Sequence, residues 1–180
     1  VEAYWQERLA LSPLQATSLG DFRWNDVLPI SISPEHRAKS LAVEKRYLAL
    51  AKGVKPQQLS GQDRLTWDVF VRAREQSIAG ARFPDELMPV DQFNGLPQSL
   101  AQLGSGTGSQ PFVTVQDYDH WLKRAGGFPA WVDQAIVNMR EGMRRGVVLP
   151  KPLVERLLPQ LDLLAPAEVE KSVFWQPVGR

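Results

Sequence analysis

The sequence predicts an all-α fold, an irregular bundle of about seven to eight helices. Apolar residues recur at spacings of three and four along most of the chain, as they do on one face of an α-helix. Strict alternation of apolar and polar residues, which is typical of half-buried strands, is scarce outside Val113 and Val115. Helix-start signals recur as well, and no internal repeat of fixed period is present.

The first helix is expected over residues 2–12, and Pro13 ends it because a proline restricts the residue before it to extended conformations. Its inward face is expected to carry four apolar side chains, Tyr4, Trp5, Leu9 and Leu11. Residues 18–33 then form an irregular link with Gly, Asp, Asn and Pro at turn positions. The link is expected to be anchored by three apolar side chains, Phe22, Trp24 and Leu28.

Two long helices follow, and we expect them to form an antiparallel pair. Ser33-Pro34-Glu35 begins the first of them with a hydroxyl, a proline and an acid in the preferred order, and this helix ends near Lys52. Ser60 repeats the start, with Asp63 at the capping-box position, and the next helix runs to about Gly80. Its apolar residues are Leu65, Trp67, Val69, Phe70, Ala73 and Ile78.

Residues 81–111 form a long connection that contains four of the 14 prolines and four of the 13 glycines. A short helix at 97–103 is the only regular piece expected there. A connection of this length within a compact domain is often functional or mobile. One hypothesis for the chain is therefore a substrate-binding protein that uses this connection.

The last part of the chain predicts four more helices. Thr114 caps one over about 115–125, and Phe128-Pro129 opens a long one to about Arg145. A further helix starts at Pro150 to Pro152 and ends near Leu164, and Pro166 starts a last short one.

The corner between the last two long helices carries three residues with a structural role. Gly142 allows close contact between helices because it has no side chain, and Gly146 can adopt the left-handed conformation that ends a helix. Pro150 stops one helix and presets the next. We interpret this corner first as a joint.

Composition bounds the function. Lys and Arg number 21 against 20 Asp and Glu, so the net charge of +1 gives no electrostatic reason to expect a nucleic acid or an anionic membrane as partner. There is no cysteine, which excludes disulfides and thiolate metal sites, and no apolar run is long enough to span a membrane. We expect residues 1–180 to form a single helical domain. Because the first residue is not Met and no helix stop precedes Arg180, we expect it to be a fragment of a longer protein.

No catalytic or metal site is predicted within the chain itself. The two histidines, His36 and His120, are far apart and no HExxH motif is present, so the possible pair of Asp117 and His120 on one helical face is expected to be solvated. The glycine-rich stretch 104–110 has neither a preceding strand nor the spacing of a phosphate-binding loop. No serine lies in a GxSxG elbow.

Three arginines, Arg140, Arg144 and Arg145, fall in the last turns of the long helix. Cations at this position offset the partial negative charge of the helix end by about 0.3–1 kcal/mol each, which is sufficient to explain them. The alternative is a site that binds a phosphate or a peptide carboxylate.

Five stretches, in order over nearly the whole chain, resemble the N-terminal region of the bacterial domain-of-unknown-function 885 family. They are ATSLGD with Arg23 and residues 26–29, LSGQDRLTWDVF, RFPDELMPVDQFNG, QPFVTVQDYDHWLKR, and FPAWVDQAIVNMREGMRRGVVLPKPLVERLL. The most specific is the last, where Arg140-Glu141-Gly142, Gly146 and Pro150 resemble the helix-corner signature of the family.

The resemblance implies more than the residues do. Full-length members of this family resemble helical zincin metallopeptidases, with HExxH and a distal acidic zinc ligand further along the polypeptide. It therefore implies that this chain needs no cofactor itself, that zinc binds in the C-terminal catalytic region, and that this region and peptides are its partners. It also implies a periplasmic or cell-envelope location, because family members often carry export signals or lipoprotein anchors.

We therefore expect a non-catalytic N-terminal helical segment of a zinc-dependent peptidase-like protein, forming part of the wall of the substrate cleft. In that setting Arg140, Arg144 and Arg145 would meet a peptide carboxylate. The main alternative is a stand-alone helical binding or scaffolding module without an enzymatic partner.

Overall fold

The computed structural model describes residues 1–93, 95–164 and 166–177, and within them every regular element is helical apart from one isolated β-bridge between Val90 and Gly95. The α-helices are α1 (Glu2–Leu11), α2 (Pro13–Ser18), α3 (Pro34–Lys52), α4 (Gly61–Gly80), α5 (Leu96–Gly104), α6 (Val115–Ala125), α7 (Phe128–Arg145) and α8 (Lys151–Leu164). Short 3₁₀ turns are η1 (Phe22–Trp24), η2 (Pro56–Gln58), η3 (Asp85–Leu87), η4 (Val169–Lys171) and η5 (Val173–Trp175). The predicted all-α irregular bundle is confirmed.

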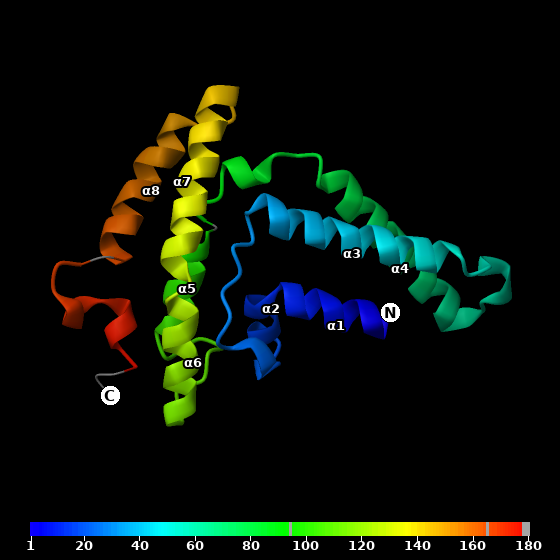
Figure 1. Ribbon diagram of the computed structural model, residues 1–180, viewed down its shortest axis with the longest axis horizontal. Coiled ribbons are helices and arrows are strands. Elements are labelled where there is room, and N and C mark those ends of the chain that lie inside the picture. The colour runs from blue at the N-terminus through cyan, green and yellow to red at the C-terminus, as the bar shows by residue number, and fades with distance from the viewer. Residues whose placement is uncertain (94, 165, 178–180) are drawn as a thin grey trace.

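The helices form two groups, and α3 and α4 lie side by side as the predicted antiparallel pair (Figure 1). Helix α1 packs along α3, and the three form an arm of the molecule. Helix α7 runs across the base of this arm and packs against η3, while α5 contacts α8 and η5 (Figure 1). Helices α1, α3 and α4 thus lie on one side of the molecule and α5 to α8 on the other (Figure 1).

Aromatic contacts join α1 to the helix pair. Tyr4 is buried, and its ring lies edge-on to Tyr47 of α3 at 5.4 Å and to Phe70 of α4 at 5.2 Å between centroids. Leu9 is buried too, but the predicted inward position of Trp5 is wrong because its side chain is 38% exposed. Successive helical side chains point about 100° apart, so Tyr4 and Trp5 cannot both face α3.

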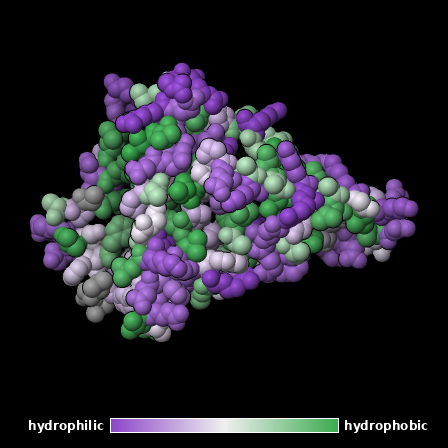
Figure 2. Space-filling view, viewed as in Figure 1, coloured by the Kyte–Doolittle hydropathy of each residue, from purple (hydrophilic) through white to green (hydrophobic). Residues whose placement is uncertain are grey.

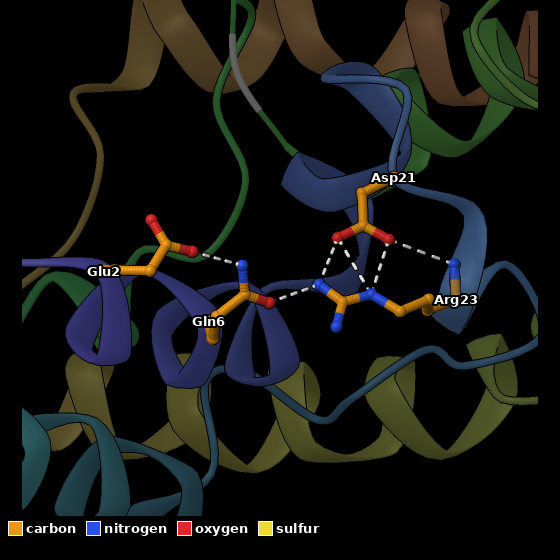
Figure 3. A network of polar contacts seen from close by, with 4 residues as sticks. All are labelled: Glu2, Gln6, Asp21 and Arg23. Atoms are coloured by element: carbon orange, nitrogen blue, oxygen red, sulfur yellow. Dashed lines mark hydrogen bonds and ion pairs between the residues drawn. The ribbon is translucent and has the colours of Figure 1, made fainter.

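Helix α2 was not predicted, because Pro13 ends α1 and also begins the next helix as its first residue. The link after α2 is held by side chains. Arg23 pairs with Asp21 at 2.6 Å and donates a hydrogen bond to Gln6 of α1 (Figure 3). The prediction that Phe22 anchors this link is wrong, because its side chain is 51% exposed.

Of the two predicted capping boxes, the one at the start of α6 forms and the one at the start of α4 does not. Thr114 and Asp117 form a complete capping box at the start of α6. At α4 the Ser60 side chain makes no capping bond, because the N–H of Asp63 bonds instead to the carbonyl oxygen of Ser60 at 3.2 Å. Within α4 the buried residue is Val71, whereas the predicted apolar residues Leu65 and Val69 are exposed.

A second core lies at the other end of the molecule. Leu100 and Leu103 of α5 are buried against Trp121 of α6. Helix α5 confirms the short helix predicted within the 81–111 connection, so this connection contributes to the core. After α8, the predicted last helix at Pro166 is replaced by the two 3₁₀ turns η4 and η5.

The buried guanidinium of Arg124 ties this core to the link. Its Nε donates to the carbonyl oxygen of Val27 at 3.1 Å, its Nη1 donates to Oε1 of Gln110 at 2.7 Å, and its Nη2 donates to the carbonyl oxygen of Trp24. Burial lowers the pKa of Arg124 to about 10, so the group stays charged at neutral pH. It therefore acts as a structural cation between the two halves.

Candidate functional site

The predicted arginines lie together at the carboxyl end of α7. Arg140, Arg144 and Arg145 are all exposed, and Arg144 forms an ion pair with Glu141 one turn earlier. Arg140 and Arg145 make no side-chain hydrogen bond or ion pair with the described residues. Arg140 and Arg145 are therefore exposed cations without an acidic partner among the described residues, and they lie beside Arg144, which has one.

The corner after these arginines is tightly built. A Cβ atom at Gly142 would lie 2.5 Å from the carbonyl oxygen of Val147 and 3.1 Å from that of Leu87 in η3. Gly146 has a φ of 72°, the left-handed conformation, and Val147 N donates to the carbonyl oxygen of Gly142 at 2.8 Å. Pro150 immediately precedes α8. The corner fixes α7 against η3.

The structure also contains a cleft that the sequence did not predict. It has a volume of about 670 Å³ and is bounded by the end of α1, the start of α2, the first half of α3 and the end of α4. A second cleft of about 690 Å³ lies between α1 and α4. Four residues line both clefts, so the two are neighbours: Arg8, Gln15, Glu44 and Ser77.

A buried polar network adjoins the clefts, since Glu44 lines both of them and Tyr4 and Arg74 line the second. Tyr4 donates its hydroxyl to Oε1 of Glu44 at 2.8 Å, and Nε of Arg74 pairs with Oε2 at 2.5 Å. The guanidinium of Arg74 also lies 4.0 Å from the centre of the Tyr4 ring. Burial and the bond to Glu44 raise the pKa of Tyr4 to about 12, so the phenol stays protonated and can only donate to this carboxylate. The network is therefore structural.

The first cleft contains ionisable groups from α1, α3 and the η3 turn. Arg8 of α1 is half-buried and donates to the hydroxyl of Ser12. His36, in the first turn of α3, has its pKa lowered by burial and then by the charges of Arg8 and Lys39, which keeps it neutral at pH 7. Arg37 pairs with Asp85 at 2.7 Å and with Glu86 at 2.8 Å, which attaches α3 to η3 at the edge of the cleft.

Sequence reasoning considered His36 only as a metal ligand and did not consider Arg8. A signal for Arg8 was present, since it lies one turn after Tyr4 on a face predicted to point inward. The cleft itself depends on how α1 crosses α3, which no local pattern encodes.

The two histidines lie in different helices, His36 in α3 and His120 in α6, and among the described residues no contact joins them into one site. Nε2 of His120 lies 3.5 Å from Nε2 of Gln116. The carboxylate of Asp117 accepts hydrogen bonds from Val113 N, Thr114 N and the Thr114 hydroxyl. Those bonds lower the pKa of Asp117 and commit its carboxylate to the cap. Among the described residues, no group of three or more His, Asp or Glu side chains is arranged to hold a metal ion.

Comparison with protein families identifies the class of the chain. Residues 13–180 match the family described as "Bacterial protein of unknown function (DUF885)". The match covers nearly the whole chain, and the chain belongs to this family. No curated protein and no solved structure matched in the corresponding searches. None of the described helices combines the length and apolar character needed to cross a bilayer.

Proposed function

We propose that this chain is the non-catalytic N-terminal helical domain of a zinc-dependent peptidase-like protein, and that it forms part of the wall of the substrate cleft. The family membership supports the comparison with full-length members that resemble zincin metallopeptidases. The donor groups of the described residues do not fit a catalytic zinc site. We therefore assign no step of a metal reaction to these residues and place the zinc in a C-terminal catalytic region.

The observation that supports this proposal most is the large surface of the chain. The chain exposes 11,372 Å², whereas a compact monomer of its 20.2 kDa exposes about 8,800 Å². The excess of about 2,600 Å² is larger than the roughly 800 Å² that one partner buries in an interface of standard size. A surface of this extent fits a domain that packs against further polypeptide.

Part of this surface is apolar. Figure 2 shows hydrophobic residues in several patches on the visible face rather than as single spots. Exposed large apolar side chains occur on all three of the last helices: Val115, Leu122, Ile136, Val137, Met143, Val154, Leu158 and Leu163. Patches of this kind in a soluble protein mark sites of interaction. We assign them to contact with the C-terminal region of the same polypeptide.

Hydroxyl-radical footprinting of the 180-residue chain and of the full-length protein tests this assignment. Leu122, Val137 and Leu163 are 67%, 59% and 79% exposed and should react rapidly in the chain alone. We expect strong protection of at least two of them in the full-length protein, while buried Leu100 stays protected in both. Equal reaction rates in the two proteins would contradict the assignment and favour the stand-alone binding module.

In this setting Arg140, Arg144 and Arg145 would face peptide substrate and bind a carboxylate, and a periplasmic or cell-envelope location belongs to the same proposal. The exposed position of the three side chains is compatible with such a contact.

A further inference from the structure

The first cleft contains a cation whose neighbouring acids are engaged elsewhere. Arg8 is half-buried, and its side chain donates a hydrogen bond to a neutral group, the Ser12 hydroxyl, without forming an ion pair to any described residue. The acids of α1 and of the cleft lining have other partners: Glu2 bonds to Gln6, Glu7 to Arg46, Glu44 to Tyr4 and Arg74, and Asp85 to Arg37. Burying a charge partly without a counterion costs free energy. An anionic ligand that pairs with Arg8 would offset this cost through charge-assisted hydrogen bonds.

His36 reinforces this preference for an anion. It lines the same cleft, and the charged groups that act on it, Arg8 and Lys39, are both cations. The His36 ring also hydrogen-bonds to the backbone of Leu11. Because a neutral imidazole has one N–H donor, the ring gains a second donor for a ligand, together with a charge, when it takes up a proton. An anion bound beside Arg8 would favour that uptake, because it offsets the two cations.

The rest of the lining selects the body of the ligand. Five leucines, each from a different segment of the chain, line this cleft: Leu11, Leu14, Leu28, Leu41 and Leu96. All five side chains are half-buried, so a bound apolar group would remove the remaining leucine surface from water. An inorganic anion such as phosphate would leave the leucine surface exposed to water. The lining therefore favours an organic acid over phosphate.

We propose that the cleft binds a carboxylate carried on an apolar body, of the kind found at the C-terminus of a peptide that ends in an aliphatic residue. The carboxylate pairs with the Arg8 guanidinium and accepts a hydrogen bond from His36, and the aliphatic group contacts the leucines. The proposal concerns binding alone and does not rest on the peptidase-like role of the full-length protein.

Three probes separate the charge from the apolar group in a ligand-observed NMR titration of the protein. N-acetyl-leucine carries both, N-acetyl-leucinamide carries only the apolar group, and inorganic phosphate carries only the charge. We expect N-acetyl-leucine to bind at least about tenfold more tightly than the amide, as expected for a hydrogen-bonded charge pair, and more tightly than phosphate. Equal binding of acid and amide, tighter binding of phosphate, or no binding of the acid would each overturn the proposal.

Variants locate the site. Arg8→Gln should weaken the binding of N-acetyl-leucine about tenfold or more, whereas the exposed control Arg156→Gln on α8, which does not line the cleft, should bind as the wild type does. Arg8→Lys keeps the charge and the apolar stem but lacks the planar fork that meets a carboxylate with two bonds, so it should fall between them. Arg8→Lys also decides the matter if Arg8→Gln fails to fold, and wild-type affinity in both Arg8→Lys and His36→Gln would then refute the site.

Discussion

The hydroxyl of Tyr4 in α1 donates a 2.8 Å hydrogen bond to Oε1 of Glu44 in α3, and Arg74 of α4 pairs with the other oxygen of that carboxylate at 2.5 Å. One buried carboxylate thus joins the three helices of the arm. A buried charge that loses a partner is strongly destabilising. This network sets the position of α1 and hence the shape of both clefts.

Tyr4→Phe removes the hydroxyl and leaves Oε1 of Glu44 without its donor. We expect the free energy of unfolding to fall by about 1–3 kcal/mol, measured by urea denaturation. The control is Arg23→Gln, which disrupts the exposed network with Asp21 and Gln6 (Figure 3) and should change stability much less. If the two variants were equally stable, the Tyr4 bond would not be a structural anchor.

Gly142→Ala places a methyl group 2.5 Å from the carbonyl oxygen of Val147, which is backbone and cannot easily move. We expect a loss of about 1–3 kcal/mol in unfolding free energy, because the α7 corner must open. Gly80→Ala is a matched control, since a Cβ there meets nothing within 4 Å. A thermal melt in which Gly142→Ala is as stable as Gly80→Ala would show that the corner is not close-packed.

His36 should titrate below its ordinary pKa of 6.5, because burial and then the charges of Arg8 and Lys39 disfavour the imidazolium. NMR can follow it directly, as the chain has only two histidines. Arg8→Gln should move the pKa of His36 upward, and an unchanged value would mean that Arg8 does not face the ring. The unfolded state binds the proton more readily, so this contribution to stability is present above pH 6.5 and is lost as pH falls through the folded pKa.

Replacing Arg144 and Arg145 together by Ala tests the contact proposed for the end of α7. In the full-length protein we expect a higher KM for peptides with a free carboxylate, by about tenfold, and little change for amidated peptides. Both side chains are exposed, so stability should change little. Unchanged turnover of both peptides would remove these arginines from the substrate contact.

Local chemistry made much of the fold predictable. Ser33-Pro34-Glu35 and the Thr114 capping box define the starts of α3 and α6, and Gly146 lies where a left-handed helix end was expected. The predictions that were wrong at α2 and at the α4 cap also have local causes. Pro13 satisfies the rules for both a helix end and a helix start, and the positive φ of Gly61, 51°, changes the backbone at the α4 cap.

The candidate site was predictable only in part. The α7 arginines are visible in the sequence because they fall in one helix end, whereas the cleft at Arg8 and His36 joins residues of two helices separated by an irregular link. Its lining depends on the crossing of α1 and α3, which the buried contacts of Tyr4 determine. Such pairings are set by tertiary packing and leave no local pattern.

The most direct test of the central claim is to measure bound zinc and peptide hydrolysis for the full-length protein beside the 180-residue chain. We predict about one zinc per molecule and measurable hydrolysis for the full-length protein, with neither for the chain alone. Tight zinc binding and matching hydrolysis by the isolated chain would contradict the claim that these helices form a non-catalytic wall, and so would a full-length protein that has no activity with zinc bound.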